Sequence, residues 1–148
     1  MLTVLTFLWN DPARNRGYTF NADHVGILRN MVQRNLSIPH QFVCVTDEAV
    51  PGVLNAPIVW DKHVPGTVFV RLCMRAEGFA WHIADHAGVQ LPTRFLSLDL
   101  DMVVTGSLDP LITPEDRFWK NPNWPAPRRS YYQSSVQLFT PGAWSTLY

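Results

Sequence analysis

Residues 94–104 read RFLSLDLDMVV, an apolar run that leads directly into two aspartates. A short apolar run of this kind, bounded by turn residues, predicts a buried β-strand. Residues i and i+2 of a strand share a face of the sheet, so Asp99 and Asp101 are predicted to project together. Like charges placed side by side repel each other unless a cation lies between them, and carboxylates are typical ligands of Mg²⁺ or Mn²⁺. A solvated strand end is the alternative interpretation.

The segments before this run alternate between strand and helix patterns. Residues 2–8 predict a buried strand, and the polar stretch WNDPARNRGY that follows predicts a loop. From Asp23 to Leu36 apolar residues recur at helical spacing, with Asn21 or Asp23 as the N-cap. Residues 41–45 (QFVCV) predict a second strand. This strand–helix–strand unit has the length of a parallel crossover.

The remaining chain continues the alternation. Residues 48–57 predict a connection, residues 58–60 a short strand and residues 67–86 a second helix. After residue 105 the chain is rich in proline, and residues 135–139 (SVQLF) predict a last strand. We therefore expect residues 1–148 to form one α/β domain with a mostly parallel sheet and helices on both faces.

The composition is that of a soluble globular domain, with 47% hydrophobic residues and a formal net charge of zero. The basic residues are scattered and form no stripe, which argues against a nucleic-acid partner. The apolar start MLTVLTFLW is too short to span a membrane and lacks a basic leader and a cleavage site. We therefore expect no transmembrane segment and a cytoplasmic location. Cys44 and Cys73, in apolar surroundings, are predicted to be buried thiols.

Two segments resemble glycosyltransferases of the GT-A fold, such as glycogenin and bacterial lipopolysaccharide glycosyltransferases. SLDLDMVVTGSLDPLI (residues 97–112) is similar to their metal-binding pattern YLDxDxxVxxxLxxL. YYQSSVQLFTPGAW (residues 131–144) is similar to their segment (F/Y)NSGVMLFNP, with residues 133–135 at the Asn-Ser-Gly positions. The stretches TFLWND and QFVCVTD match where that family begins its nucleotide-binding domain.

The resemblance implies a Rossmann-like GT-A sheet, a nucleoside-diphosphate-sugar donor (most often a UDP-sugar) and a Mn²⁺ or Mg²⁺ ion. Asp101 would bind the metal that bridges the diphosphate, and Asp99 would share the metal and touch the ribose. Further donor-binding positions follow from the same resemblance. They are Thr6, Phe7 and Leu8 against the base and ribose, largely through their backbone, Asn10 or Asp11 at the base edge, Arg71 toward the donor, and Ser134 in the second segment. The acceptor and the catalytic residue stay unassigned.

Members of this family continue well beyond this length and carry a third metal ligand, usually a histidine near the C-terminus. No histidine follows Asp101 here, so we expect a glycosyltransferase domain truncated at its C-terminus. Such a chain should expose apolar side chains at its end, namely Val136, Leu138, Trp144 and Leu147.

Two other functions stay open. One is a non-catalytic or truncated module that binds nucleotide and metal, and the other is a sugar-phosphate nucleotidyltransferase. His82 and His86 have the spacing of a helical metal pair, although a solvated helix end is the favoured interpretation.

Overall fold

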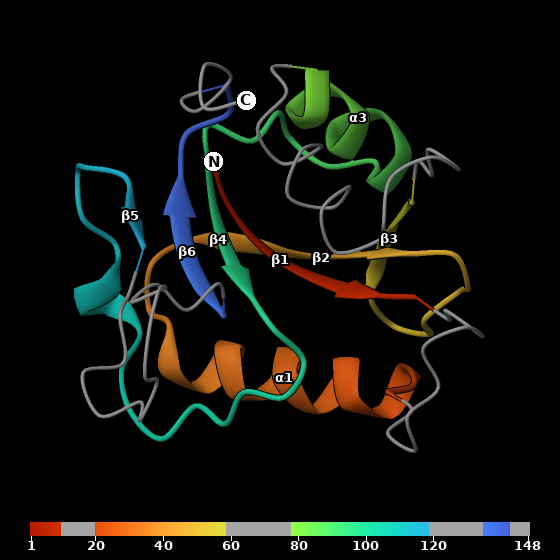
Figure 1. The fold of residues 1–148 in the computed structure, drawn as a ribbon, viewed down its shortest axis with the longest axis horizontal. Helices are drawn as coiled ribbons and strands as arrows, with labels where there is room; N and C mark the ends of the chain where they lie inside the picture. The colour runs from red at the N-terminus through yellow and green to blue at the C-terminus, as the bar shows by residue number, and fades with distance from the viewer. Residues whose placement is uncertain (10–19, 59–77, 119–134, 143–148) are drawn as a thin grey trace, which may run out of the picture.

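The computed structural model describes residues 1–9, 20–58, 78–118 and 135–142. A six-stranded sheet with the order β3-β2-β1-β4-β6-β5 runs through its centre (Figure 1). The strands are β1 (Leu2–Leu8), β2 (His40–Thr46), β3 (Leu54–Pro57), β4 (Arg94–Leu98), β5 (Arg117–Phe118) and β6 (Val136–Phe139). The described helices are α1 (Ala22–Asn35), α3 (Gly78–Ala87) and the 3₁₀ helix η1 (Asp109–Leu111).

The sheet is mixed, with most of its strands parallel. β2 and β4 pair in parallel with β1, and β3 pairs in parallel with β2. β6 runs antiparallel to both β4 and β5. The prediction of an α/β domain with a mostly parallel sheet is therefore confirmed.

The β1–α1–β2 crossover forms as its sequence predicts. Asn21 is the N-cap of α1, and its Oδ1 accepts hydrogen bonds from the backbone N of Asp23 (3.1 Å) and of His24 (3.3 Å). His24 Nδ1 in turn accepts from the backbone N of Asn21 (3.3 Å), which completes a capping box. An N-cap of this kind stabilises a helix by about 1 kcal/mol.

Alternate residues of the central strands supply two apolar cores, one on each side of the sheet. The α1-side core joins α1 to one set of strand residues, and the α3-side core joins α3 to the other set (Figure 1). The α1-side core includes Val4, Leu8, Val25, Leu28, Val32, Cys44, Leu96, Leu98 and Leu138. The α3-side core includes Leu5, Val43, Val45, Phe79, Ala80, Ile83, Phe95 and Phe139.

The third strand and the second helix differ in position from the prediction. β3 comprises Leu54–Pro57, within the predicted connection, and not residues 58–60, of which only Ile58 is described. The cause is Asn55, whose amide donates to the backbone O of Val50 (3.1 Å) and Val53 (2.8 Å) and whose Oδ1 accepts from the backbone N of Val50 (3.2 Å). These bonds close a turn that starts the strand early. α3 begins at Gly78 in the described chain, and residues 67–77 of the predicted helix lie outside it.

The last strand is confirmed, but the expected exposure of Leu138 is wrong. Leu138 is fully buried because β6 lies between β4 and β5, which turns this side chain into the α1-side core. Val136 is partly buried against the same core. Trp144 and Leu147 lie outside the described residues.

Two smaller expectations concern the thiols and the membrane. Cys44 is a free thiol buried in the α1-side core, as predicted, whereas Cys73 lies outside the described residues. Among the helices of the described ranges, none is long and apolar enough to cross a membrane.

Candidate ligand site at the carboxyl edge of the sheet

The carboxyl ends of β1, β2, β3 and β4 meet at one edge of the sheet because these strands are parallel. From β1 the chain passes through α1 to β2, which lies on one side of β1. The strand that follows α3 is β4, which lies on the other side of β1. The connections from the two central strands therefore lead in opposite directions. Such a topological switch point is where open α/β sheets bind their ligands.

β1 and β4 separate at this switch point. Their pairing runs from Leu2–Arg94 to Leu5–Ser97, while β1 continues beside β2 as far as Leu8 (Figure 1). β4 stays with β6 instead, and the backbone N of Asp99 donates to the backbone O of Ser135 (3.0 Å). The acidic pair thus begins where β4 leaves β1.

Asp99 and Asp101 directly follow β4, as predicted, but they lie in a turn. β4 ends at Leu98, and the backbone N of Met102 donates to the backbone O of Asp99 (3.4 Å). The rule that residues i and i+2 share a face requires extended backbone, so it does not apply to this pair. Leu100 and Met102 pack against the α1-side core, which leaves Asp99 half-buried and Asp101 exposed.

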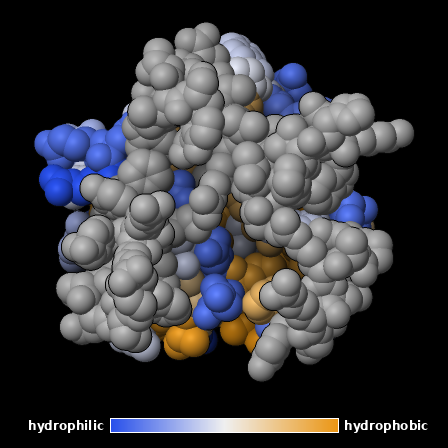
Figure 2. Space-filling view, in the orientation of Figure 1, coloured by the Kyte–Doolittle hydropathy of each residue, from blue (hydrophilic) through white to orange (hydrophobic). Residues whose placement is uncertain are grey.

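Hydrophilic and hydrophobic residues are adjacent on this surface. Figure 2 shows both colours side by side in the part of the view where Figure 1 has the end of β4 and the segment after it. Val103 is 73% exposed in this segment, while its neighbours Met102 and Val104 pack against the α1-side core. Exposed Asp101 and Val103 therefore alternate with residues that pack against the α1-side core.

The β1 residues predicted to contact the base and ribose lie at the same edge. Thr6 and Leu8 are buried, and Phe7 is partly buried against the α3-side core. Thr6 and Leu8 are 0% and 1% exposed as whole residues, so their backbone is enclosed by the protein together with their side chains, and Phe7 is the more accessible of the three.

Four predicted positions, Asn10, Asp11, Arg71 and Ser134, lie outside the described residues. The residue after Ser134 is described, and its carbonyl is the partner of Asp99, so the structure brings the second family-like segment next to the acidic pair. Within the described ranges, no group of three or more His, Cys, Asp or Glu could hold a metal ion. Two carboxylates suit a hard cation that takes its other ligands from phosphate and water.

The histidine pair on α3 has a structural role. The carbonyl of Pro57 accepts a hydrogen bond from His82 Nε2 (2.8 Å), which ties α3 to the end of β3. The ring of His82 also stacks on Phe79, and its centroid lies 4.6 Å from that of His86. A solvated helix end therefore stays the favoured interpretation over a metal pair, because Nε2 of His82 already donates a hydrogen bond to Pro57.

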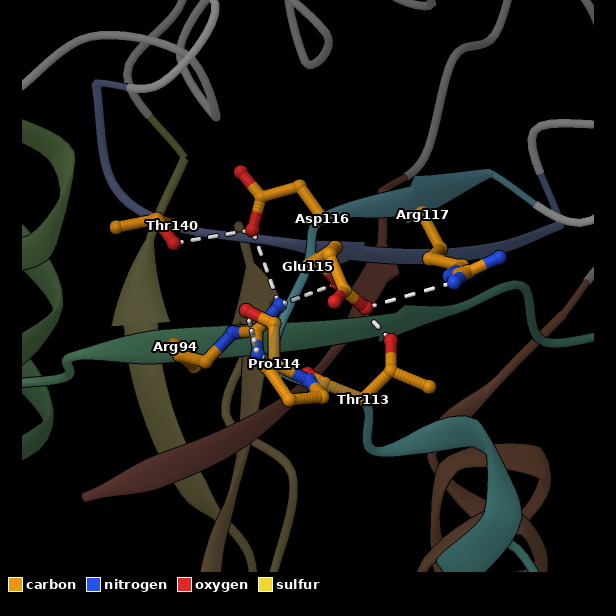
Figure 3. Close-up of polar contacts among 7 residues, drawn as sticks. All are labelled: Arg94, Thr113, Pro114, Glu115, Asp116, Arg117 and Thr140. Atoms are coloured by element: carbon orange, nitrogen blue, oxygen red, sulfur yellow. Dashed lines mark hydrogen bonds and ion pairs between the residues drawn. The ribbon is translucent and has the colours of Figure 1, made fainter.

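A second polar cluster lies at the other end of β4 (Figure 3). Arg94, the first residue of β4, donates to the backbone O of Thr113, Pro114 (3.0 Å) and Glu115 (2.8 Å) and pairs with Asp116 Oδ1 (3.0 Å). Thr140 Oγ1 donates to the same carboxylate oxygen (3.0 Å). These bonds hold the segment before β5 against β4 and the end of β6, so the cluster fastens the sheet edge and is not a ligand site.

Two buried polar residues close to the acidic pair escaped the sequence analysis. Ser97 and Gln137 pair across β4 and β6 and are 3% and 6% exposed. They are the polar members of the runs FLSLDL and SVQLF, and Ser97 precedes Asp99 by two positions. Polar residues at core-facing strand positions were the signal that could have identified them.

No known protein family matches the chain, and no curated protein is significantly similar to it in sequence.

Proposed function

We propose that this chain is the donor-binding part of a metal-dependent glycosyltransferase of the GT-A type. Asp99 and Asp101 would bind Mn²⁺ or Mg²⁺ against the diphosphate of a nucleoside-diphosphate sugar, first of all a UDP-sugar. The supporting observation is the position of the acidic pair, which directly follows β4 at the topological switch point. The two-layer covering of the sheet, with α1 and α3 on opposite sides, is in keeping with such a domain.

Three residues would contribute to the proposed donor site in different ways. Asp99 is held through its backbone by Ser135 and Met102, and it is half-buried. Asp101 is exposed at the turn, where it can reach a cation from the solvent side. Bound metal would supply positive charge to a diphosphate leaving group. Arg71 would add a second positive charge on the donor side.

A module that binds nucleotide and metal without transferring sugar is the second candidate. It is favoured by the ligand count, because the described residues offer two adjacent carboxylates and no third metal ligand beside them. Both candidates share the donor site, and only the transferase would release UDP from a UDP-sugar.

The test is the mutual dependence of metal and nucleotide. A site with two carboxylates completes its metal coordination with phosphate oxygens, so each ligand should raise the affinity of the other by the same factor. By calorimetry, UDP should bind roughly 10- to 100-fold more tightly with Mn²⁺ than with EDTA. Equal affinity in both conditions would exclude the metal-bridged site.

Two variants sharpen this test. Asp101→Asn should abolish the effect of Mn²⁺ on UDP binding while leaving the stability of the metal-free protein unchanged or slightly higher, because it removes one of two like charges. Asp85→Asn, which changes an exposed aspartate on α3, is the matched control and should leave the effect intact. Release of UDP from a UDP-sugar by the wild-type chain would then distinguish the transferase from the binding module.

A further inference from the structure

The segment between the acidic turn and η1 forms a strap along α1. Figure 1 shows it running along this helix from the end of β4 toward the start of β2. We call residues 102–108 the strap. Met102 and Val104 pack against the α1-side core and Leu108 is buried in it, whereas Val103 and Thr105 are exposed. Inward and outward side chains therefore alternate over the first half of the strap, as they do in an extended chain.

Among the described residues, the backbone hydrogen bonds of the strap lie at its two ends. At the first end, the backbone N of Met102 donates to the backbone O of Asp99 (3.4 Å). At the second end, the backbone N of Leu108 donates to the backbone O of Asn35, the last residue of α1 (2.7 Å). Apolar packing is non-directional, so it covers the core without fixing where the strap lies along the helix. The position of the strap therefore depends on its ends.

The second end carries the stronger attachment. The carboxylate of Asp109 accepts hydrogen bonds from Ser37 Oγ (2.7 Å) and from the backbone N of Ser37 (2.8 Å). The backbone N of Asp109 donates to Oγ of Ser107 in the strap (3.2 Å). Bonds to a carboxylate are roughly twice as strong as bonds between neutral groups, and these are also shorter than the 3.4 Å bond at the acidic turn. The strap is thus held firmly at the end that is remote from the candidate site.

We infer that Asp109 is a positioning residue for the metal site, because it ties the strap to the end of α1 and so restricts the movement of Asp101; this inference rests on the proposed function. Asp99 is already held by the bond from its backbone N to the backbone O of Ser135 (3.0 Å), whereas exposed Asp101 lies between Asp99 and the strap. A chain that is ordered in advance loses less entropy when a ligand binds. Without the tie, the cost of ordering the turn would be added to metal binding.

The measurement is the factor by which Mn²⁺ raises the affinity for UDP, determined by calorimetry with Mn²⁺ and with EDTA. Asp109→Ala removes both bonds from Ser37. We expect this variant to lower the factor roughly fivefold from wild type and to keep its affinity for UDP in EDTA within about twofold. Ser37→Ala removes only the Oγ bond, so it should lower the factor in the same direction and serves if Asp109→Ala folds poorly.

Asp116→Ala is the matched control. The carboxylate of Asp116 also joins distant segments, since its Oδ1 accepts from Arg94 Nη2 (3.0 Å) and from Thr140 Oγ1 (3.0 Å). Asp116 follows η1 and lies outside the strap. Urea unfolding should show a loss of stability in both Asp109→Ala and Asp116→Ala, but Asp116→Ala should keep the wild-type factor. This comparison separates positioning of the metal site from general stability.

Hydrogen exchange of the wild-type chain tests the same coupling from the other end. If the metal site and the tie are coupled, Mn²⁺ with UDP should slow exchange of the Leu108 amide, which donates to Asn35. The reference is the Val89 amide, which donates to Ala84 at the end of α3. We expect the ligands to slow exchange at Leu108 several-fold more than at Val89.

The outcomes separate the two claims. If Mn²⁺ does not change the affinity of the wild-type chain for UDP, the proposed function is overturned together with the inference. The metal site stands and the role of Asp109 is overturned if Asp109→Ala keeps the wild-type factor, or if Asp109→Ala and Asp116→Ala lower it equally. Equal slowing of exchange at Leu108 and Val89 would also overturn the role of Asp109.

Discussion

Asp109 ties the segment after the acidic turn to the end of α1. Its two carboxylate oxygens accept hydrogen bonds from Ser37 Oγ (2.7 Å) and from the backbone N of Ser37 (2.8 Å). The Ser37 side chain, followed by its backbone, lowers the pKa of Asp109 below its ordinary value of 3.8. A second bond, from the backbone N of Leu108 to the backbone O of Asn35 (2.7 Å), joins the same two segments. One aspartate thus joins two distant parts of the chain.

This tie predicts an acid-sensitive contribution to stability. Because the pKa of Asp109 is lower in the folded protein, its contribution is present above pH 3.8 and is lost as pH falls further. We expect Asp109→Asn to lower the urea midpoint of unfolding at neutral pH, and this difference from wild type to shrink at pH 3. Ser37→Ala should reproduce most of the neutral-pH loss. A difference that stays constant between the two pH values would contradict this role.

At the level of elements, two glycines have opposite relations to their helices. Gly88 follows α3 with φ +64°, and the backbone N of Val89 donates to the backbone O of Ala84 (3.2 Å), the bond of a Schellman motif. Gly26 lies inside α1, and a Cβ added there would meet nothing within 4 Å. The first glycine suits its left-handed conformation, whereas the second weakens its helix.

The same substitution should therefore have opposite effects at these two positions. Gly26→Ala should raise the free energy of unfolding by roughly 0.5–1 kcal/mol, because alanine has the higher helix propensity. Gly88→Ala should lower it by about 1–2 kcal/mol, because a left-handed conformation strains a residue with a Cβ. Urea denaturation of both variants checks the pair, and a change of the same sign at both positions would contradict the assignment.

At the level of the whole molecule, Cys44 reports on the integrity of the α1-side core. Burial raises the pKa of its thiol from 9.0 to about 12, with a small further increase from Glu48 against a decrease from the backbone of Leu8. The reactive thiolate is therefore suppressed in the folded protein. Since the unfolded chain ionises first, the stability associated with Cys44 is complete below pH 9.0 and is lost as pH rises toward 12.

We expect Cys44 to react with a thiol reagent only when the protein unfolds. The measurement uses a Cys73→Ser background, so that one thiol remains, and compares the labelling rate with the unfolding rate across a urea series. Cys44→Ala should remove the labelling and destabilise the core by an amount consistent with a small cavity. Rapid labelling without denaturant would show that this core opens independently of global unfolding.

Local sequence patterns were sufficient for the elements whose signals are local. The strands β1, β2, β4 and β6, the helix α1 and its cap at Asn21 follow from apolar periodicity and capping chemistry, and the acidic pair was correctly placed after β4. These features depend on residues a few positions apart, and such interactions are encoded in short windows.

The strand order and the antiparallel insertion of β6 were decided by the tertiary structure. Both depend on hydrogen bonds between segments that are distant in sequence. The pairing of Ser97 with Gln137 is the clearest case. Each is recognisable in its own run as a polar residue among apolar ones, but the two become neighbours only because β6 pairs with β4 in one particular register.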